Sequence, residues 1–270
     1  MSASAWPGLG AVAAGARPLV LGHRGTIGLG VRENTMEAYQ RALDDGADGF
    51  ELDVRRSGDG ELVVLHDPFV PGGPEVRRVE VSALPRWLPR LADVLDAFPD
   101  ALVDVEVKDL PRERGSSRAF AEGTAEAVAR LLRDRDTTRI VVTSFSPRIL
   151  RGLRIHGGEE LTLGLLLGGL VPGSWALGVA RRVDAAALLP RGAAVSATLR
   201  RRDVDAGLAL VAWSADGAEA ARALAAAGVA GLIVDDPAAT LRVLADGAAG
   251  SGPAPAPGGV SEGRSAAPGG

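Results

Sequence analysis

Short apolar runs alternate with helix-forming segments along most of this chain, and this alternation is the feature that most limits its fold. Four segments have clear helical patterns: 34–46, 91–98, 119–135 and 217–228. Nine further runs have the length and character of buried strands: 18–23, 49–54, 61–67, 101–108, 140–145, 161–167, 185–190, 208–214 and 230–236. Strands that alternate with helices predict a parallel sheet.

One connection is too short to join parallel strands. Only the four residues SGDG, 57–60, separate the second strand from the run 61–67. A parallel crossover needs a dozen or more residues, whereas a tight glycine-containing turn joins antiparallel strands. We therefore expect a hairpin, which leaves eight parallel strands in about 230 residues, the size of a (β/α)₈ TIM barrel. An open doubly wound sheet is the alternative, although the early glycines lack the dinucleotide-binding spacing.

Composition separates one folded domain, 17–246, from two ends. Residues 247–270 are rich in Pro, Gly, Ala and Ser and carry almost no large apolar side chain, so they predict a disordered tail. Residues 1–16 predict a poorly ordered segment. They lack the basic stretch of a signal peptide, and Pro7 interrupts their apolar residues.

Composition also excludes several classes of function. A formal net charge of −4 does not provide the basic face that nucleic acids need, and the absence of cysteine excludes disulfides and thiolate sites. The uncharged run 161–180 is about long enough to span a bilayer, but its glycines, with Pro172 and Ser174, favour a buried strand followed by a loop. We expect a cytoplasmic protein without a membrane span, and no obligate protein partner is evident.

Charged side chains gather on three predicted strands whose carboxyl ends would be neighbours at the mouth of a barrel. These residues are His23 and Arg24, Glu51 and Asp53, and Glu106 and Lys108. Residues two apart on a strand point to the same side, and like charges that point together need a positive group between them. A divalent cation held by Glu51, Asp53 and Glu106 would meet that need, and an all-oxygen ligand set suits Mg²⁺ or Ca²⁺. Pairing of the carboxylates with arginines or with Lys108, the single lysine of the chain, is the alternative.

Two of the three histidines converge on this acidic cluster. His23 ends the first strand, and a hairpin turn centred on 57–60 places His66 opposite Glu51. His156 is expected at a helix end on the surface. Histidine transfers protons near neutral pH, and cations neutralise charge on a phosphoryl group. Since the sequence has neither a nucleophile elbow nor a P-loop, the cluster favours hydrolysis of a phosphoester.

At these residues the sequence resembles the glycerophosphodiester phosphodiesterase family. The matching pieces, in the family's order, are LGHRG, RENTMEAYQRALDDGADGFELDVRRSGDGELVVLHDP, VEVK, VVTSFSP, VAWSAD and GLIVDDP. They cover nearly the whole folded region. The resemblance implies a metal-dependent (β/α)₈ enzyme that cleaves glycerophosphodiesters, its small-molecule substrates, to glycerol 3-phosphate and an alcohol.

The resemblance also implies a role for each residue that matches the family's motifs. The acid–base pair would be His23 and His66, and the metal ligands Glu51, Asp53 and Glu106. Phosphate would be held by Arg24 and Lys108, while Glu33 and Asn34 would order the first loop or touch the ligand. Trp213 would either pack on a glycerol group or lie buried in the barrel wall.

The sequence departs from the family's pattern in three places. Arg32 stands where proline is usual, and Ser214 and Asp216 replace a threonine and an asparagine. Only about 40 residues separate His66 from Glu106, which leaves little of the family's substrate-covering insertion. We therefore expect an open pocket that favours larger or lipid-like diesters.

Two other functions remain open at this point. A lysophospholipase D, or a phospholipase C-like enzyme that forms a cyclic phosphate, would use the same histidines and metal. A non-catalytic barrel that binds a phosphodiester would not need paired acid–base groups. The sequence leaves open the alcohol group, the native metal, which histidine is the acid, and the oligomeric state.

Overall fold

The computed structural model describes residues 17–28, 30–108, 118–169, 171–196, 199, 207–215 and 217–249. The predictions for residues 1–16 and for most of the tail lie outside these ranges. The last helix, α8 (Pro237–Ala249), continues three residues past the predicted domain end at 246.

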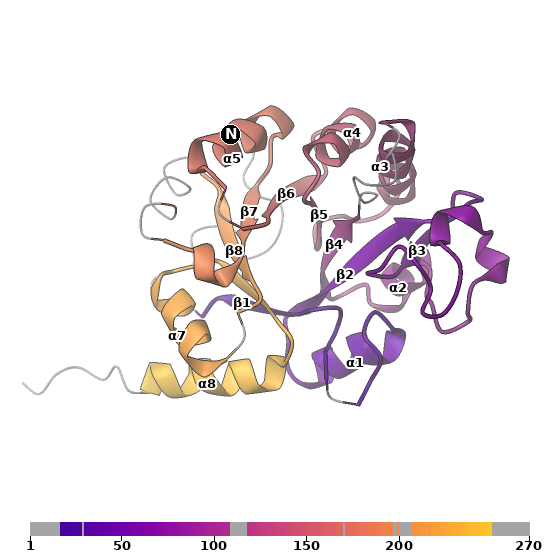
Figure 1. Ribbon diagram of the computed structural model, residues 1–270. Helices are drawn as coiled ribbons and strands as arrows, with labels where there is room; N and C mark the ends of the chain where they lie inside the picture. Colours follow the sequence, from indigo (N-terminus) through magenta and orange to yellow (C-terminus); the bar gives the residue numbers. More distant parts are fainter. Residues whose placement is uncertain are drawn as a thin grey trace, which may run out of the picture.

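Eight parallel strands form a closed barrel (Figure 1). They are β1 (Leu19–Gly22), β2 (Gly49–Arg56), β4 (Leu102–Val107), β5 (Ile140–Ser144), β6 (Thr162–Leu167), β7 (Ala187–Pro190), β8 (Ala209–Trp213) and β9 (Gly231–Val234). Strand β1 pairs with β2 on one side and with β9 on the other, so Leu21 lies opposite both Gly49 and Ile233. This closure confirms the TIM barrel and excludes the open sheet.

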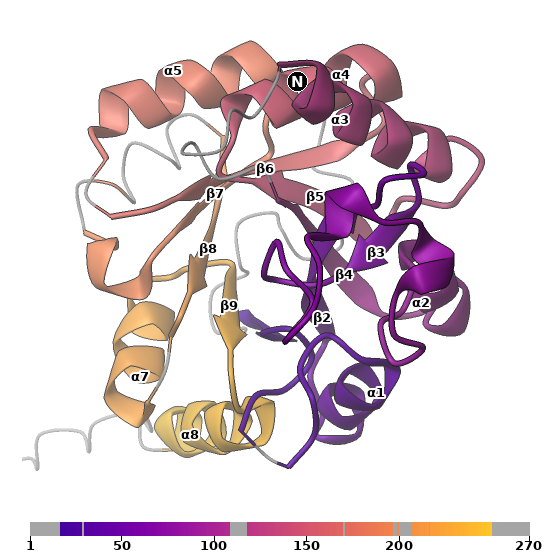
Figure 2. The same cartoon turned by 45° about the vertical axis from the view of Figure 1, so that its right-hand side comes forward.

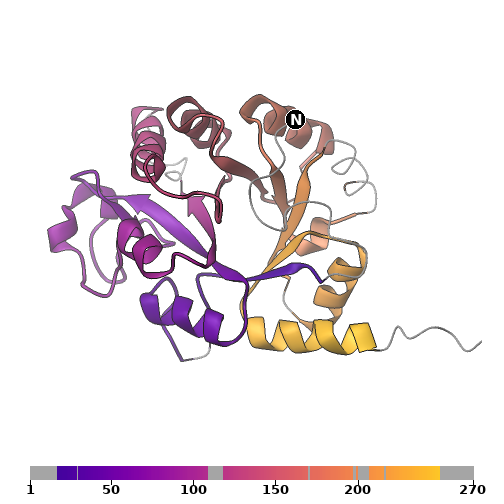
Figure 3. The same cartoon turned by 180° about the vertical axis from the view of Figure 1, so that it is seen from behind.

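Helices surround the barrel in the order expected for alternating strands and helices (Figure 2). They are α1 (Met36–Asp44), α2 (Leu91–Ala97), α3 (Arg118–Leu132), α4 (Pro147–Gly157), α5 (Gly173–Val183), α7 (Ala218–Ala226) and α8. Figure 3 shows α8, in yellow, and α1, in indigo, along one side of the barrel. The largest apolar core lies between the strands and this helical layer, and a second apolar cluster fills the barrel interior.

The segment 161–180 corrects one expectation. Strand β6 is where the sequence places it, but the loop after it is shorter than expected, because α5 begins at Gly173 and takes in Ser174. Its buried residues are Ala176, Val179, Ala180 and Val183, a spacing that buries one face of a helix. Among the described residues, no helix is long and apolar enough to cross a membrane.

The hairpin after β2 is confirmed, with a different register. Strand β3 (Leu62–Val64) runs antiparallel to β2, and Val54 pairs with Val64. The predicted pairing of His66 with Glu51 would instead place Val54 opposite Val63, so it is wrong by one residue. The reason is a longer turn: Ser57 N–H donates to the Glu61 carbonyl at 2.9 Å, and Gly60 takes a φ of +94°.

The chain between β3 and α2 forms a small excursion with a core of its own. Two short 3₁₀ helices lie in it, η1 (Val76–Arg78) and η2 (Val81–Ala83). Six buried apolar residues form its core: Val63, Leu65, Val70, Val76, Leu84 and Leu88. The Arg32 guanidinium lies 4.1 Å from the ring centre of Trp87, so the excursion is tied to the loop after β1.

Candidate active site

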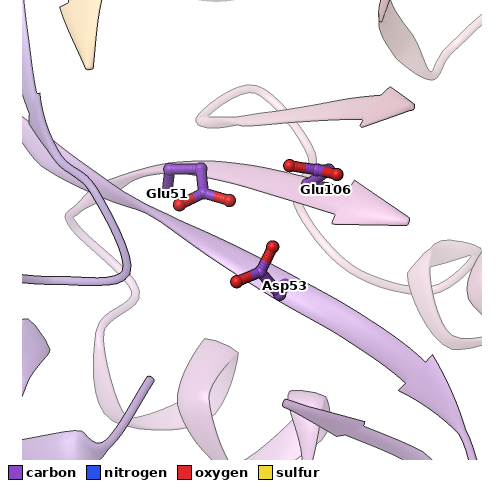
Figure 4. A group of neighbouring side chains, drawn as sticks. All are labelled: Glu51, Asp53 and Glu106. Carbon is purple, nitrogen blue, oxygen red and sulfur yellow. The ribbon is translucent and has the colours of Figure 1, made fainter. Parts of the chain in front are cut away.

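Three carboxylates on the neighbouring strands β2 and β4 converge (Figure 4). Glu51 and Asp53 come from β2 and Glu106 from β4, and the parallel register sets Asp53 beside Glu106. One oxygen from each lies within 4.8 Å of the others, and all three residues are at most 7% exposed. The alternation of side chains along two neighbouring strands therefore builds the cluster that the sequence suggested.

Two cations lie against this cluster. Lys108 Nζ is 2.7 Å from Asp53 Oδ1 and also pairs with Glu106, while Arg24 Nε is 3.2 Å from Asp53 Oδ2. The Arg24 backbone N–H donates to Glu51 Oε2 at 2.9 Å. Asp53 and Glu106 are therefore paired with basic side chains, as the alternative to a metal site predicted. Glu51 is left with one buried oxygen, Oε1, that has no hydrogen-bond partner among the described residues.

The pKa values follow this uneven compensation. Burial raises the pKa of Glu51 well above its usual range, and the nearby charges of Asp53 and Glu106 raise it further. Burial alone would also raise the pKa of Asp53, but Lys108 and Arg24 bring it below its usual value. Burial raises the pKa of Glu106 in spite of Lys108. Because three carboxyl groups face two cations and Glu51 Oε1 has no partner among the described residues, the oxygen-only cluster fits a hard divalent cation.

A fourth acid, Asp104, extends the cluster and was missed from the sequence. It lies opposite Glu51 in the β2–β4 register and accepts a 2.6 Å hydrogen bond from the Thr143 hydroxyl. Burial raises its pKa to about 8, against the effect of that hydrogen bond. The signal was available, since Asp104 is two residues before Glu106 on one strand and points to the same side.

Each of the two predicted catalytic histidines has a carboxylate partner. His23 Nδ1 lies 2.7 Å from Asp235 Oδ1, and His66 Nδ1 lies 2.8 Å from Asp67 Oδ1. An Nδ1–H donated to a carboxylate leaves Nε2 available for proton transfer. Sequence reasoning missed both partners, although Asp235 directly follows β9, the neighbour of β1.

His66 lies beyond the end of β3 but stays within electrostatic reach of the acidic cluster. Burial lowers its pKa, and Lys108 and Arg24 lower it further, although Asp53 raises it. The Arg55 guanidinium donates to the His66 carbonyl and holds this part of the chain against β2. The one-residue register change therefore leaves His66 in the neighbourhood of Asp53.

The first loop positions the cluster through Glu33 and Asn34. Glu33 accepts a 2.8 Å hydrogen bond from the Arg24 guanidinium. Asn34 Nδ2 donates to Asp53 Oδ2 at 2.8 Å, and its Oδ1 accepts from the Tyr39 hydroxyl at 3.0 Å. Both residues therefore orient other members of the site.

Trp213 lies at the end of β8, half-buried, and is neither free at the mouth nor fully within the wall. Its Nε1–H donates to the Leu189 carbonyl at 2.9 Å, and the Arg191 guanidinium lies 4.6 Å from its ring centre. Phe145, just after β5, contacts it edge to face at 5.5 Å. The pair therefore joins the ends of β5 and β8, two strands that are not neighbours in the sheet. Phe145 and Arg191 were not expected from the sequence, and Asp216 lies outside the described residues.

Comparison with known proteins agrees with this geometry. The model of the glycerophosphoryl diester phosphodiesterase family matches residues 23–239. The chain belongs to this family. It is 29% identical over 253 residues to a glycerophosphodiester phosphodiesterase of Caldanaerobacter subterraneus, which covers 86% of this chain and 99% of that protein. Membership makes the chain an enzyme of the phosphodiesterase kind.

Solved structures share the fold at lower identity. A phosphodiesterase of Oleispira antarctica, in complex with the product sn-glycerol-3-phosphate, has a TM-score of 0.75 and 21% identity and covers 85% of this chain and 97% of that one. The glycerophosphodiester phosphodiesterase of Thermotoga maritima has a TM-score of 0.70 and 22% identity and covers 84% and 98%. At these sequence identities, the structural similarity shows only that the folds are the same.

Proposed function

We propose that this enzyme hydrolyses glycerophosphodiesters to glycerol 3-phosphate and an alcohol, with His23 and His66 as its acid–base pair. The observation that carries the proposal is a buried acidic cluster that also holds Arg24 and Lys108. The His23–Asp235 pair directly precedes Arg24, and the His66–Asp67 pair lies within electrostatic reach of Asp53. Family membership supports the reaction class.

Arg24 and Lys108 would bind the phosphate of the substrate. Arg24 is preorganised for this because Glu33 and Asp53 hold its guanidinium from two sides. Preorganised cations at a buried site stabilise the charge that develops on phosphoryl oxygens during displacement. Lys108 provides a second positive group at the same strand ends.

The histidines would move the protons. We assign His23 as the base that accepts a proton from the attacking water, and His66 as the acid that protonates the leaving alkoxide. The bond between phosphorus and the alcohol oxygen breaks, and the water oxygen stays on phosphorus. Asp235 and Asp67 orient the two rings through their Nδ1 atoms.

Glu51, Asp53 and Glu106 would hold one divalent cation, Mg²⁺ or Ca²⁺. When bound, such an ion supplies Lewis-acid polarisation of a phosphoryl oxygen. The buried, unpartnered oxygen of Glu51 supports this assignment.

A panel of glycerophosphodiesters tests the proposal directly. The choline, ethanolamine and glycerol diesters should all release glycerol 3-phosphate, measured by a coupled dehydrogenase assay. The Phe145–Trp213 pair offers apolar surface at the mouth, so lysophosphatidylcholine belongs in the same panel. Release of choline from the lysolipid, with no turnover of the soluble diesters, would favour a lysophospholipase D. A cyclic phosphate product would favour the phospholipase C-like reaction.

A further inference from the structure

Helices α3, α4 and α5 form a groove on the outside of the barrel. Figure 2 shows the three helices together on one side of the strands. The groove has a volume of about 770 Å³, within the range of small-molecule sites. Its lining comes from these helices alone and includes none of the residues assigned to the barrel mouth.

The walls of this groove carry excess positive charge. Arg148 and Arg151 line it from α4 and Arg182 from α5, against one glutamate, Glu122. All three arginines are exposed, and none makes an ion pair or a hydrogen bond with another described residue. Guanidinium groups bind phosphate and carboxylate through two parallel hydrogen bonds, so the walls favour an anionic group.

The floor of the groove is apolar. Val179 and Val183 lie buried at its base. Ile155, which also lines it, is 66% exposed, the largest value among the exposed large apolar residues of the described chain. An alkyl chain laid along the groove would remove Ile155 from water, which favours binding.

We propose that this groove binds one anionic amphiphile, with its phosphate or carboxylate head on the three arginines and its alkyl chain over Ile155 and Val179. The volume fits a single molecule. A stable protein partner would need about 800 Å² of surface on each side, and a bilayer favours a flat or convex face over a concave one. The proposal does not depend on the reaction at the barrel mouth.

Dodecyl phosphate is a suitable probe because, as a phosphomonoester, it has no diester bond to cleave. Titration calorimetry below its critical micelle concentration should show one site. Replacing Arg148, Arg151 and Arg182 together by glutamine should weaken binding by about tenfold or more. The matched control is Arg181→Gln on the same helix, since Arg181 is exposed and lies outside the groove lining. It should change the affinity by less than about twofold.

Ile155→Gln provides a second variant that keeps every charge. It should weaken binding of the probe because the alkyl chain loses its apolar contact, while the melting temperature changes little because Ile155 is 66% exposed and glutamine is a good helix former. Inorganic phosphate and dodecyl maltoside should each bind about tenfold more weakly than dodecyl phosphate, since phosphate has no alkyl chain and the maltoside has no anionic head.

Several results would overturn the proposal. Equal losses from Arg181→Gln and the triple variant would mean that general charge, and not the groove, holds the probe. Displacement by excess glycerol 3-phosphate would place the probe at the barrel mouth. An unchanged affinity in Ile155→Gln would remove the groove from the binding site. Tighter binding of a polyglutamate peptide or of phosphatidylglycerol vesicles would assign the surface to a protein or a bilayer.

Discussion

The charged side chains of the barrel mouth are paired and mostly buried, whereas the arginines of the outer groove are exposed and unpaired within the described part of the chain. At the mouth, Arg24 and Lys108 lie directly against the carboxylates of Asp53 and Glu106, and the acids are buried. In the groove, the three arginines are exposed and have no partner among the described residues. The physical reason is desolvation, because a buried charge needs a partner and an exposed charge is stabilised by water.

In each region, the charge that remains indicates the sign of the ligand. At the mouth, the carboxyl of Glu51 is not paired with Arg24 or Lys108 and keeps one buried oxygen without a partner among the described residues, which fits a cation. The groove is left with positive charge, which fits an anion. The charged side chains of the mouth are therefore held by one another, whereas the groove arginines are stabilised by water and stay free to pair with a ligand.

Removal of divalent metal should have the largest effect. EDTA should abolish turnover, and added Mg²⁺ or Ca²⁺ should restore it, because Glu51, Asp53 and Glu106 lose the cation that balances them. Glu51→Gln should weaken metal binding in calorimetry and still fold, since it puts a neutral amide where burial already favours the neutral carboxyl. Binding of dodecyl phosphate in the groove should be insensitive to EDTA. A metal-free enzyme with full activity would refute the metal assignment.

Loss of either catalytic histidine should have the next largest effect. His23→Ala and His66→Ala should each lower kcat by about 10²- to 10⁴-fold, the usual contribution of general acid–base catalysis. The pH profile of the parent enzyme should be bell-shaped. A nitrophenyl diester needs little protonation of its leaving group, so it should rescue the variant that lacks the acid, His66→Ala. The exposed His156→Ala is the control, with unchanged turnover. Near-normal rates of both variants on a natural diester would disprove the assignment.

The buried carboxyl of Asp104 should make the stability of the protein depend on pH. Its pKa rises from 3.8 to about 8 in the folded protein. Between these values, the folded chain keeps a proton that the unfolded chain has lost, so the free energy of unfolding falls as the pH rises. Asp104→Asn should flatten the dependence of melting temperature on pH between about 4 and 8, measured in EDTA. The exposed Asp93→Asn on α2 should leave it unchanged. An equal slope in Asp104→Asn and the parent would contradict the expectation.

The contact between Arg32 and Trp87 should matter only slightly. Arg32 precedes Glu33, which holds Arg24, and its stacking on Trp87 ties that loop to the excursion. An exposed cation–π contact contributes about 0.5–1 kcal/mol, so Arg32→Ala should lower kcat/KM by about two- to fivefold. The exposed Arg86→Ala, beside Trp87, is the control. A larger loss from Arg86→Ala would assign the effect to surface charge.

Deletion of residues 250–270 should have the smallest effect. Their composition has no apolar set that would pack on the barrel, so melting temperature and turnover should stay nearly unchanged. The affinity of the groove for dodecyl phosphate should also stay the same. A gain in that affinity would show that the tail competes for the groove, and a fall of several degrees in melting temperature would show that it packs on the domain.

The amino-acid sequence by itself determined the barrel and the acidic cluster. Each apolar run is a local signal, and the short turn at 57–60 required a hairpin and therefore eight parallel strands. Glu51, Asp53 and Glu106 came together because alternation along a strand and the order of neighbouring strands are both readable in the sequence.

Only the tertiary structure decided the partners of these residues. His23 and Asp235 are 212 positions apart and meet because β1 and β9 close the barrel. The hairpin register depended on the φ of Gly60, and the contact of Phe145 with Trp213 depended on the curvature that brings β5 and β8 across one mouth. The groove has the same origin, since the helical pattern places the arginines on the surface but only helix packing sets α4 and α5 around a cavity. Local periodicity specifies which face a side chain takes, whereas closure and packing specify what it meets there.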